Sequence, residues 1–124
     1  MNENAFEMIT DRLSHYSASK LERYEPVMID ANGKYAKATG ARPFIGVVEY
    51  GVDDADEMVT IVKGIYPIIA GGDIDKGALL MIDTGTVKEA EAGEIVIGVA
   101  LAAATEGNVV SVQMIDPFEF GDSE

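Results

Sequence analysis

The residues that could do chemistry in this sequence are few, and they do not form a catalytic set. The chain has one histidine, His15, and no cysteine. Nucleophilic catalysis needs a serine, threonine or cysteine beside a histidine base that an acid orients. No Gly-x-Ser-x-Gly motif is present, and the lack of cysteine removes disulfides, thiolate nucleophiles and cysteine-based zinc sites. We therefore expect His15 to be a surface residue and predict no catalytic residues and no enzyme activity.

The acidic run from Asp53 to Glu57 is the one plausible cation site. Calcium prefers several carboxylate and carbonyl oxygens, but an EF-hand loop needs acidic residues at alternating positions, then a glycine and a late glutamate. The run lacks that order, so the sequence favours a solvated loop, with a weak calcium site as the alternative. Paired carboxylates for glycoside hydrolysis are found in any chain with 22 acidic residues, so they carry no information here.

The glycine-rich connection 70–77 could in principle hold a phosphate or a carrier lysine. A phosphate-binding loop has Gly-x-x-x-x-Gly-Lys followed by Ser or Thr, whereas Gly71 and Gly72 lead into two aspartates that would repel a phosphate. A carrier domain of the lipoyl or biotinyl type would need a lysine beside a methionine at a hairpin tip. Lys76 lies between an aspartate and a glycine instead. We interpret the stretch as a linker and predict no cofactor and no metal.

The overall charge limits the partners of the chain. The 124 residues carry a formal charge of −13, whereas binding to nucleic acids or anionic membranes depends on Lys and Arg that neutralise phosphates. Both classes of partner are therefore excluded, and a protein partner with a basic patch is favoured. No run approaches the ~20 apolar residues of a membrane span, and no signal peptide is visible. The absence of cysteine fits a reducing compartment.

The first 26 residues differ from the rest of the chain, because they contain no glycine and no valine. Four apolar residues follow steps of three and four, as on one face of an amphipathic helix: Phe6, Ile9, Leu13 and Tyr16. Several serines in the segment are indifferent helix formers, and a proline closes it at position 26. The sequence therefore predicts an N-terminal helix, or an arm that becomes ordered when a partner covers its stripe.

From Val27 onward the sequence has the pattern of short strands and turns, and it repeats. The triplet at 28–30 returns at 81–83, the triplet at 45–47 returns at 97–99, and 58–61 returns loosely at 109–112. Nearly constant shifts indicate a duplicated unit of roughly 50 residues. Short strands with regular turn signals predict an all-β fold, either a small β-barrel or a sandwich of two similar units.

These patterns divide the chain into three parts. The first is the arm or helix, 1–26; the second is the duplicated module, 27–117, with units at about 27–69 and 78–117; the third is an acidic tail, 118–124. Gly46 and Gly98 occupy equivalent places inside strands of the two units. A glycine inside a strand usually marks a bulge, a bend or a close backbone approach, so we predict structural roles for both.

The order of motifs after the arm is also informative. A strand and an Asp-x-x-Gly turn are followed by the strand 44–48, the phrase from Gly72 to Leu80, an Asp-Thr-Gly turn, and the strand 97–102. This order resembles the small tailed-phage capsid decoration, or cement, proteins of the lambda-like β-tulip type. The resemblance covers about residues 26–116, and the first 25 residues lie outside it.

The resemblance implies a non-enzymatic protein of the virion, made in the host cytoplasm and carried on the capsid exterior. Such proteins assemble, commonly as homotrimers, at three-fold or quasi-three-fold positions of the expanded phage head. There they clamp neighbouring subunits of the major capsid protein and stabilise the head. Their N-terminal arms tend to contact the capsid, so position alone makes four residues the capsid-contact candidates: Phe6, Ile9, Leu13 and Tyr16.

Two other functions stay open at this point. A β-module that binds carbohydrate or another ligand, on a phage fibre or a cell surface, predicts that Tyr35, Tyr50 and Tyr66 are exposed together on one face. An enzyme that uses acidic residues or a metal predicts that four aspartates converge in a pocket: Asp53, Asp54, Asp56 and Asp73.

Overall fold

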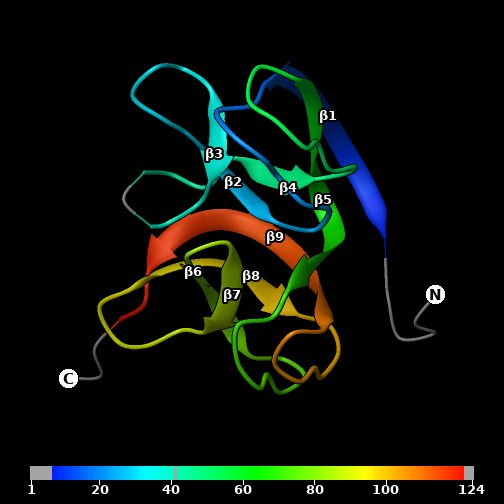
Figure 1. Cartoon of the computed structure of the whole chain (residues 1–124). Helices are drawn as coiled ribbons and strands as arrows, with labels where there is room; N and C mark the ends of the chain where they lie inside the picture. Colours follow the sequence, from blue (N-terminus) through cyan, green and yellow to red (C-terminus); the bar gives the residue numbers. More distant parts are fainter. Residues whose placement is uncertain (1–6, 41, 122–124) are drawn as a thin grey trace.

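The computed structural model describes residues 7–40 and 42–121, and in these residues the fold is entirely β (Figure 1). The strands are β1 (Met8–Tyr16), β2 (Pro26–Ile29), β3 (Tyr35–Lys37), β4 (Gly46–Val48), β5 (Met58–Ile69), β6 (Leu79–Asp83), β7 (Thr86–Glu89), β8 (Ile95–Ala100) and β9 (Val109–Glu119). All strand pairs are antiparallel, and they form one sheet that curls into a half-barrel. The all-β prediction is confirmed, whereas the described residues form neither a closed barrel nor a sandwich of two separate sheets. No helix in the described residues is long and apolar enough to cross a membrane.

The strand order is symmetric about the pair β5–β9. It is β3-β2-β4-β5-β9-β8-β6-β7, with β1 added to β5. Hydrogen bonds outside the ladders correspond as well: Leu21 N–H donates to the carbonyl of Val52 at 3.1 Å, and 53 and 52 residues later Ile74 N–H donates to the carbonyl of Ala104 at 2.8 Å. The correspondence thus extends beyond the predicted first unit, 27–69, into the connection that follows β1. It is the arrangement that two similar units joined side by side would give.

The same correspondence gives β1 a counterpart inside β5. Ser17 N–H, directly after β1, donates to the carbonyl of Glu57 at 2.9 Å, and Ala70 N–H, directly after β5, donates to the carbonyl of Asn108 at 2.7 Å. With a shift of 53, Met8–Tyr16 therefore corresponds to the stretch 61–69 of β5. In the fold, β1 pairs with β5 as β5 pairs with β9.

The core is shared between the two halves. The main cluster takes side chains from both, among them Val62 and Tyr66 of β5, Leu80 of β6 and Val112 of β9. A smaller cluster covers the other face of the first half: Leu21, Val27, Tyr35, Val48, Val59 and Ile61. Successive side chains of a strand point to opposite faces, so Ile61 enters the smaller cluster and Val62 the main one. Because the main cluster spans both halves, the two units form one domain.

Gly46 and Gly98 lie against the same element in the two halves. A Cβ on Gly46 would lie 3.0 Å from the carbonyl oxygen of Val62, and a Cβ on Gly98 would lie 2.8 Å from that of Gln113. Val62 and Gln113 are related by the shift of 51 that relates β5 to β9. Each glycine therefore allows the neighbouring strand to approach closely, and a side chain at either position would have to displace it.

The predicted N-terminal helix is wrong, because residues 8–16 form the strand β1. Its ladder with β5 runs from the pair Tyr16–Met58 to the pair Met8–Ile65, with an irregularity between Ile9 and Asp11. The hydrogen bonds of that ladder satisfy main-chain groups that β5 would otherwise leave open, and no local pattern shows their availability. In a strand, residues three apart lie on opposite faces, so the helical stripe does not exist.

The ends of the described chain lie on different flanks of the molecule. Figure 1 shows β1 at the right of the half-barrel and the end of β9 at the left, beside the loop that follows β3. The strand β1 and the C-terminal end of β9 therefore lie on different sides of the half-barrel.

Candidate functional site

The acidic run Asp53 to Glu57 is a folded loop with hydrogen bonds of its own and an ion pair to Lys34. The carboxylate of Glu57 accepts hydrogen bonds from the main-chain N–H groups of Asp53, at 3.0 Å, and Asp54, at 3.1 Å. Asp56 pairs with the ammonium group of Lys34. Within residues 7–40 and 42–121, no three acidic or histidine side chains are placed to hold a metal ion. The carboxylates of Asp56 and Glu57 therefore help to fold the loop.

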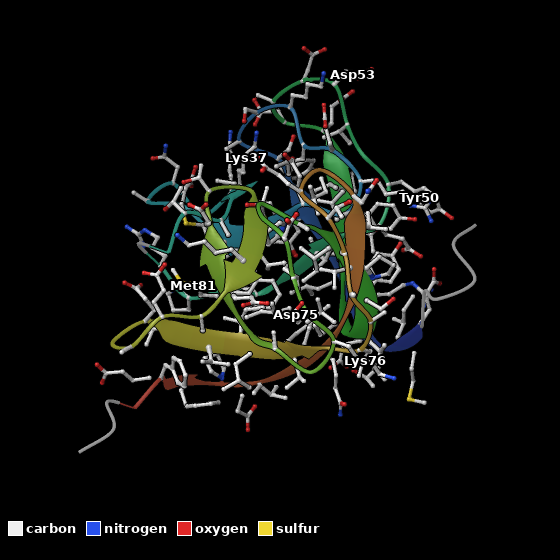
Figure 2. The ribbon with its side chains drawn as sticks, turned by 90° about the horizontal axis from the view of Figure 1, so that it is seen from below. Lys37, Tyr50, Asp53, Asp75, Lys76 and Met81 are labelled. Atoms are coloured by element: carbon white, nitrogen blue, oxygen red, sulfur yellow. The ribbon has the colours of Figure 1, made fainter. Side chains whose placement is uncertain are left out.

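The acidic and glycine-rich segments do not meet in a pocket. Asp73 accepts a hydrogen bond from the N–H of Glu106 at 3.2 Å, in the second half of the molecule. Figure 2 shows Asp53 at one end of the molecule and Asp75 and Lys76 towards the other. The predicted convergence of an acidic enzyme site is therefore wrong.

The three tyrosines expected of a carbohydrate-binding face are not exposed together. Tyr35 and Tyr66 are each 1% exposed, whereas Tyr50 is 65% exposed. Burial raises the pKa of the Tyr35 and Tyr66 phenols above the ordinary value, and Arg23 partly opposes that rise at Tyr66. The first two rings belong to the core, so the aromatic binding face is wrong.

The most exposed element of the fold is β1. Eight of its nine residues are exposed, including Met8 and Leu13, each 63% exposed, and Tyr16, 48% exposed. Met58, which lies opposite Tyr16 on β5, is 54% exposed. Only Ile9 turns inward, where it packs against the main core. A strand whose side chains contribute so little to the core is a candidate for contact with a partner.

Specific side-chain contacts fix β1 to its neighbours. Arg12 forms two hydrogen bonds of 3.2 Å to the carboxylate of Glu49, which raises the pKa of this guanidinium. The Ser14 and Thr60 hydroxyls are 2.6 Å apart. The Tyr35 hydroxyl donates to the Leu13 carbonyl at 3.1 Å. These contacts hold β1 in a defined place while its exposed apolar groups stay free of the core.

Close to its N-terminal end, the main chain of β1 lies in very close contact with a glycine of β5, Gly64, which is paired with Ile9. Gly64 has a φ of +119°, and a Cβ there would lie 2.2 Å from the carbonyl oxygen of Met8. A role for Gly64 was not predicted, although a glycine inside the long apolar run 58–66 is a visible signal. Beside this contact, a groove of about 410 Å³ is lined by residues of β1, β5 and β9.

Of the four capsid-contact candidates, the structure describes three. Leu13 lies opposite Ile61 and Tyr16 lies opposite Met58, so the two exposed side chains occupy different faces of β1. Ile9 is half-buried, and Phe6 lies outside the described residues. Sequence reasoning missed Met8 and Met58, because a single exposed methionine has no distinguishing pattern.

A model of the phage cement protein family matches residues 9–114 of this sequence. The chain belongs to the phage cement protein family. The match begins inside β1, so the strand that the sequence resemblance had left outside the pattern is part of the family's domain. As a cement protein, the chain is a structural component of the phage head that associates with the capsid, and it is not an enzyme.

A solved structure supports the fold independently of the family model. The N base of the head fiber gp8.5 of bacteriophage phi29 is similar to this cement protein with a TM-score of 0.68 and 20% sequence identity, over 85% of this chain and 95% of that one. At that identity the similarity shows a common fold and nothing finer. A comparison with curated proteins found no match.

Proposed function

We propose that this cement protein binds the outer surface of the expanded phage head as a homotrimer, at three-fold or quasi-three-fold positions, and stabilises the head against internal pressure. The proposal is supported by the exposure of β1: this strand lies within the region that matches the family, and almost its whole length is exposed. Exposing two large apolar side chains to water is unfavourable for a strand that only supports the core. It is explained if a partner covers these side chains.

The proposed contact residues are those on the two faces of β1. Leu13 and Tyr16 would each bury an apolar side chain against the major capsid protein, while Ile9 anchors the strand to the core. Phe6 remains a candidate by its position in the sequence. Each single contact of this size is weak, but a trimer presents three copies of it, and linked contacts gain strength through effective concentration.

The charge distribution agrees with a local, specific contact. β1 contains one carboxylate and one guanidinium, from Asp11 and Arg12, in a chain whose formal charge is −13. Like charges on the remaining surface would oppose non-specific association between copies. The nearly neutral strand is therefore a favourable place for a protein to approach.

The proposal is tested by the occupancy of heads. Expanded heads that lack the protein are incubated with the wild-type chain or with a Leu13→Ser, Tyr16→Ser variant, pelleted, and analysed for bound copies. Ile95→Ser is the control, because Ile95 is also exposed, at 50%, but belongs to β8. We expect the double variant to lose occupancy and the control to keep it.

Two further measurements address the finer claims of the proposal. The mass of the protein in solution and on the head should correspond to three copies, and saturated heads should withstand heating that opens unsaturated ones. Equal occupancy for the double variant and the control would refute the role of β1. A saturated head with no gain in stability would refute the stabilising function.

A further inference from the structure

The direction of the main-chain groups along β1 follows from its neighbours. Glu49 N–H donates to the carbonyl of Thr60 at 3.0 Å, on the side of β5 that faces β4. Main-chain groups of a strand alternate in direction, so those of the odd-numbered residues of this stretch of β5, such as Ile61, face β1. Their partners on β1 are Leu13 and His15, and Ser17 continues the series with its bond to Glu57.

The even-numbered residues of β1 therefore point their N–H and C=O groups away from the sheet. They are Arg12, Ser14 and Tyr16. The parallel bridge between Ser17 and Tyr35 brings β3 beside the carbonyl of Tyr16, whereas Arg12 and Ser14 lie in no ladder or bridge of the described residues other than the one with β5. The outer edge of β1 thus offers two consecutive outward donor and acceptor pairs, at Arg12 and Ser14, followed by the N–H of Tyr16. Unpaired edges of this kind accept a strand from another chain unless the protein blocks them.

The other ends of the sheet are covered, at least in part. Ala18 N–H donates to the carbonyl of Tyr35 beside β3, at 2.8 Å, and Gly71 N–H donates to that of Val87 on β7, at 2.7 Å. These hydrogen bonds belong to two parallel bridges, Ser17–Tyr35 and Ala70–Val87. The first bridge covers the outer side of β3 and the second covers the outer side of β7. Within the described residues, β1 is a long strand at an end of the sheet that pairs only with β5, and β3 reaches its outer side only at the C-terminal end, beside Ser17.

The counterpart of this edge inside the molecule is occupied. With the shift of 53, the outward residues of β1 correspond to Ile65, Pro67 and Ile69 of β5. Ile65 pairs with Met8, and Ile69 N–H donates to the carbonyl of Tyr24 at 3.1 Å. The same edge is thus filled where the chain supplies a partner, and it is open on β1, where no earlier unit precedes it.

Charge decides between the two protein partners that could fill the edge. The bonds between Ser17 and Glu57 place the acidic loop Asp53 to Glu57 beside the C-terminal end of β1. A second copy added antiparallel would bring its own acidic loop towards Asp11, and one added parallel would bring the two loops together. The parallel arrangement places carboxylates against carboxylates, which is destabilising, whereas the antiparallel one places the loop beside Arg12 as well as Asp11. The formal charge of −13 on each copy disfavours both arrangements. A strand with a cation near the loop is favoured instead.

We infer that β1 binds the capsid by accepting an extended segment of the major capsid protein as a further strand of its sheet, with a Lys or Arg of that segment near the loop Asp53 to Glu57. Main-chain hydrogen bonds to Arg12, Ser14 and Tyr16 supply the attachment, and Leu13 and Tyr16 contact the added strand on its two faces. The inference rests on the proposed function, since it specifies how the proposed surface binds.

The test replaces one outward N–H group. Ser14→Pro removes the donor and places a ring where the added strand would lie, while Ser14→Ala, the matched control, keeps the donor and loses only the hydroxyl contact with Thr60. The fold accepts proline at this place, because Pro67 occupies the corresponding position of β5. We expect Ser14→Pro to stay folded and to bind expanded heads about tenfold more weakly or worse, and Ser14→Ala to bind like the wild type.

Hydrogen exchange gives a second, independent measurement. In the free protein, the amides of Leu13 and His15 should be protected and those of Arg12, Ser14 and Tyr16 should exchange quickly. On saturated heads, the latter three should become protected. Equal head binding by both Ser14 variants, or no new protection on heads, overturns the inference while the proposed function stands. Loss of the solution trimer in Ser14→Pro also overturns it, because the edge would then serve a second copy. Failure of the wild type to bind heads overturns the proposed function itself.

Discussion

Replacing Gly64 by alanine should release the beginning of β1 from the sheet. The residue has a φ of +119°, far from the left-handed region that alanine tolerates, and the new Cβ would lie 2.2 Å from the carbonyl oxygen of Met8 and 2.9 Å from the nitrogen of Thr10. Both atoms belong to the main chain, so neither can rotate away. Backbone strain of this kind costs about 1–3 kcal/mol, and β1 can relieve the overlap only by moving off β5.

Thermal unfolding measures the cost. A domain of this size loses about 4 °C for each kcal/mol, so we expect Gly64→Ala to melt about 4–12 °C below the wild type. Gly72→Ala is the matched control, because its new Cβ would meet nothing within 4 Å and its φ is not positive. Alanine there restricts the unfolded chain and should leave the melting temperature unchanged or slightly raised.

Hydrogen exchange locates the effect within the fold. In Gly64→Ala, the amides at the beginning of β1 should lose protection, while those of β6 and β8, which do not contact it, should keep theirs. If Gly64→Ala and Gly72→Ala melt alike, the reasoning from the close contact of β1 with Gly64 fails. If protection falls equally in all strands, the glycine supports the whole sheet and not the attachment of β1.

Three further changes test other parts of the fold. Gly98→Ala should destabilise the protein by about 1–3 kcal/mol and more than Gly46→Ala in urea unfolding, because its Cβ would lie 2.5 Å from Val112 Cγ1 whereas the nearest atoms to Gly46 are at 3.0 Å; equal midpoints would contradict this. Ser17→Ala should cost about 1–3 kcal/mol in the same assay, because the buried hydroxyl bonds both the carbonyl of Asp54 and the N–H of Glu57; an unchanged midpoint would show that the loop folds without it. Burial raises the pKa of Tyr35 and Tyr66, so the unfolded state ionises first as the pH rises; the stability that these neutral phenols contribute should be complete below about pH 10 and be lost above it. Tyr35→Phe should therefore flatten part of the alkaline loss in a pH series of melts, and an identical alkaline profile for this variant would disprove the role of Tyr35.

Much of the fold could be predicted from the sequence because its signals are local. Turn residues at regular spacing gave the all-β class, and three motifs with nearly constant shifts gave the strand pattern that the symmetric sheet order now displays. Gly46 and Gly98 were recognised as a pair for the same reason. Each of these features depends on residues close in the chain, and short-range patterns record them.

The errors came from contacts that join distant residues. β1 is a strand because it pairs with β5, which lies some 50 residues further on in the sequence. No pattern in the residues from Met8 to Tyr16 indicates that pairing. Burial of Tyr35 and Tyr66 depends on the packing of the whole half-barrel, and tyrosine occurs both in cores and on surfaces. Gly64 needs to be a glycine because β1 lies against it, and its neighbours in the sequence do not indicate that contact.

The separation of β1 from the end of β9 has a practical consequence. Since the two lie on different flanks of the half-barrel (Figure 1), a peptide or small domain fused beyond the last strand would leave the molecule well away from the strand proposed to grip the head. With attachment through β1 as proposed, the end of β9 is therefore the place at which to add sequence for display.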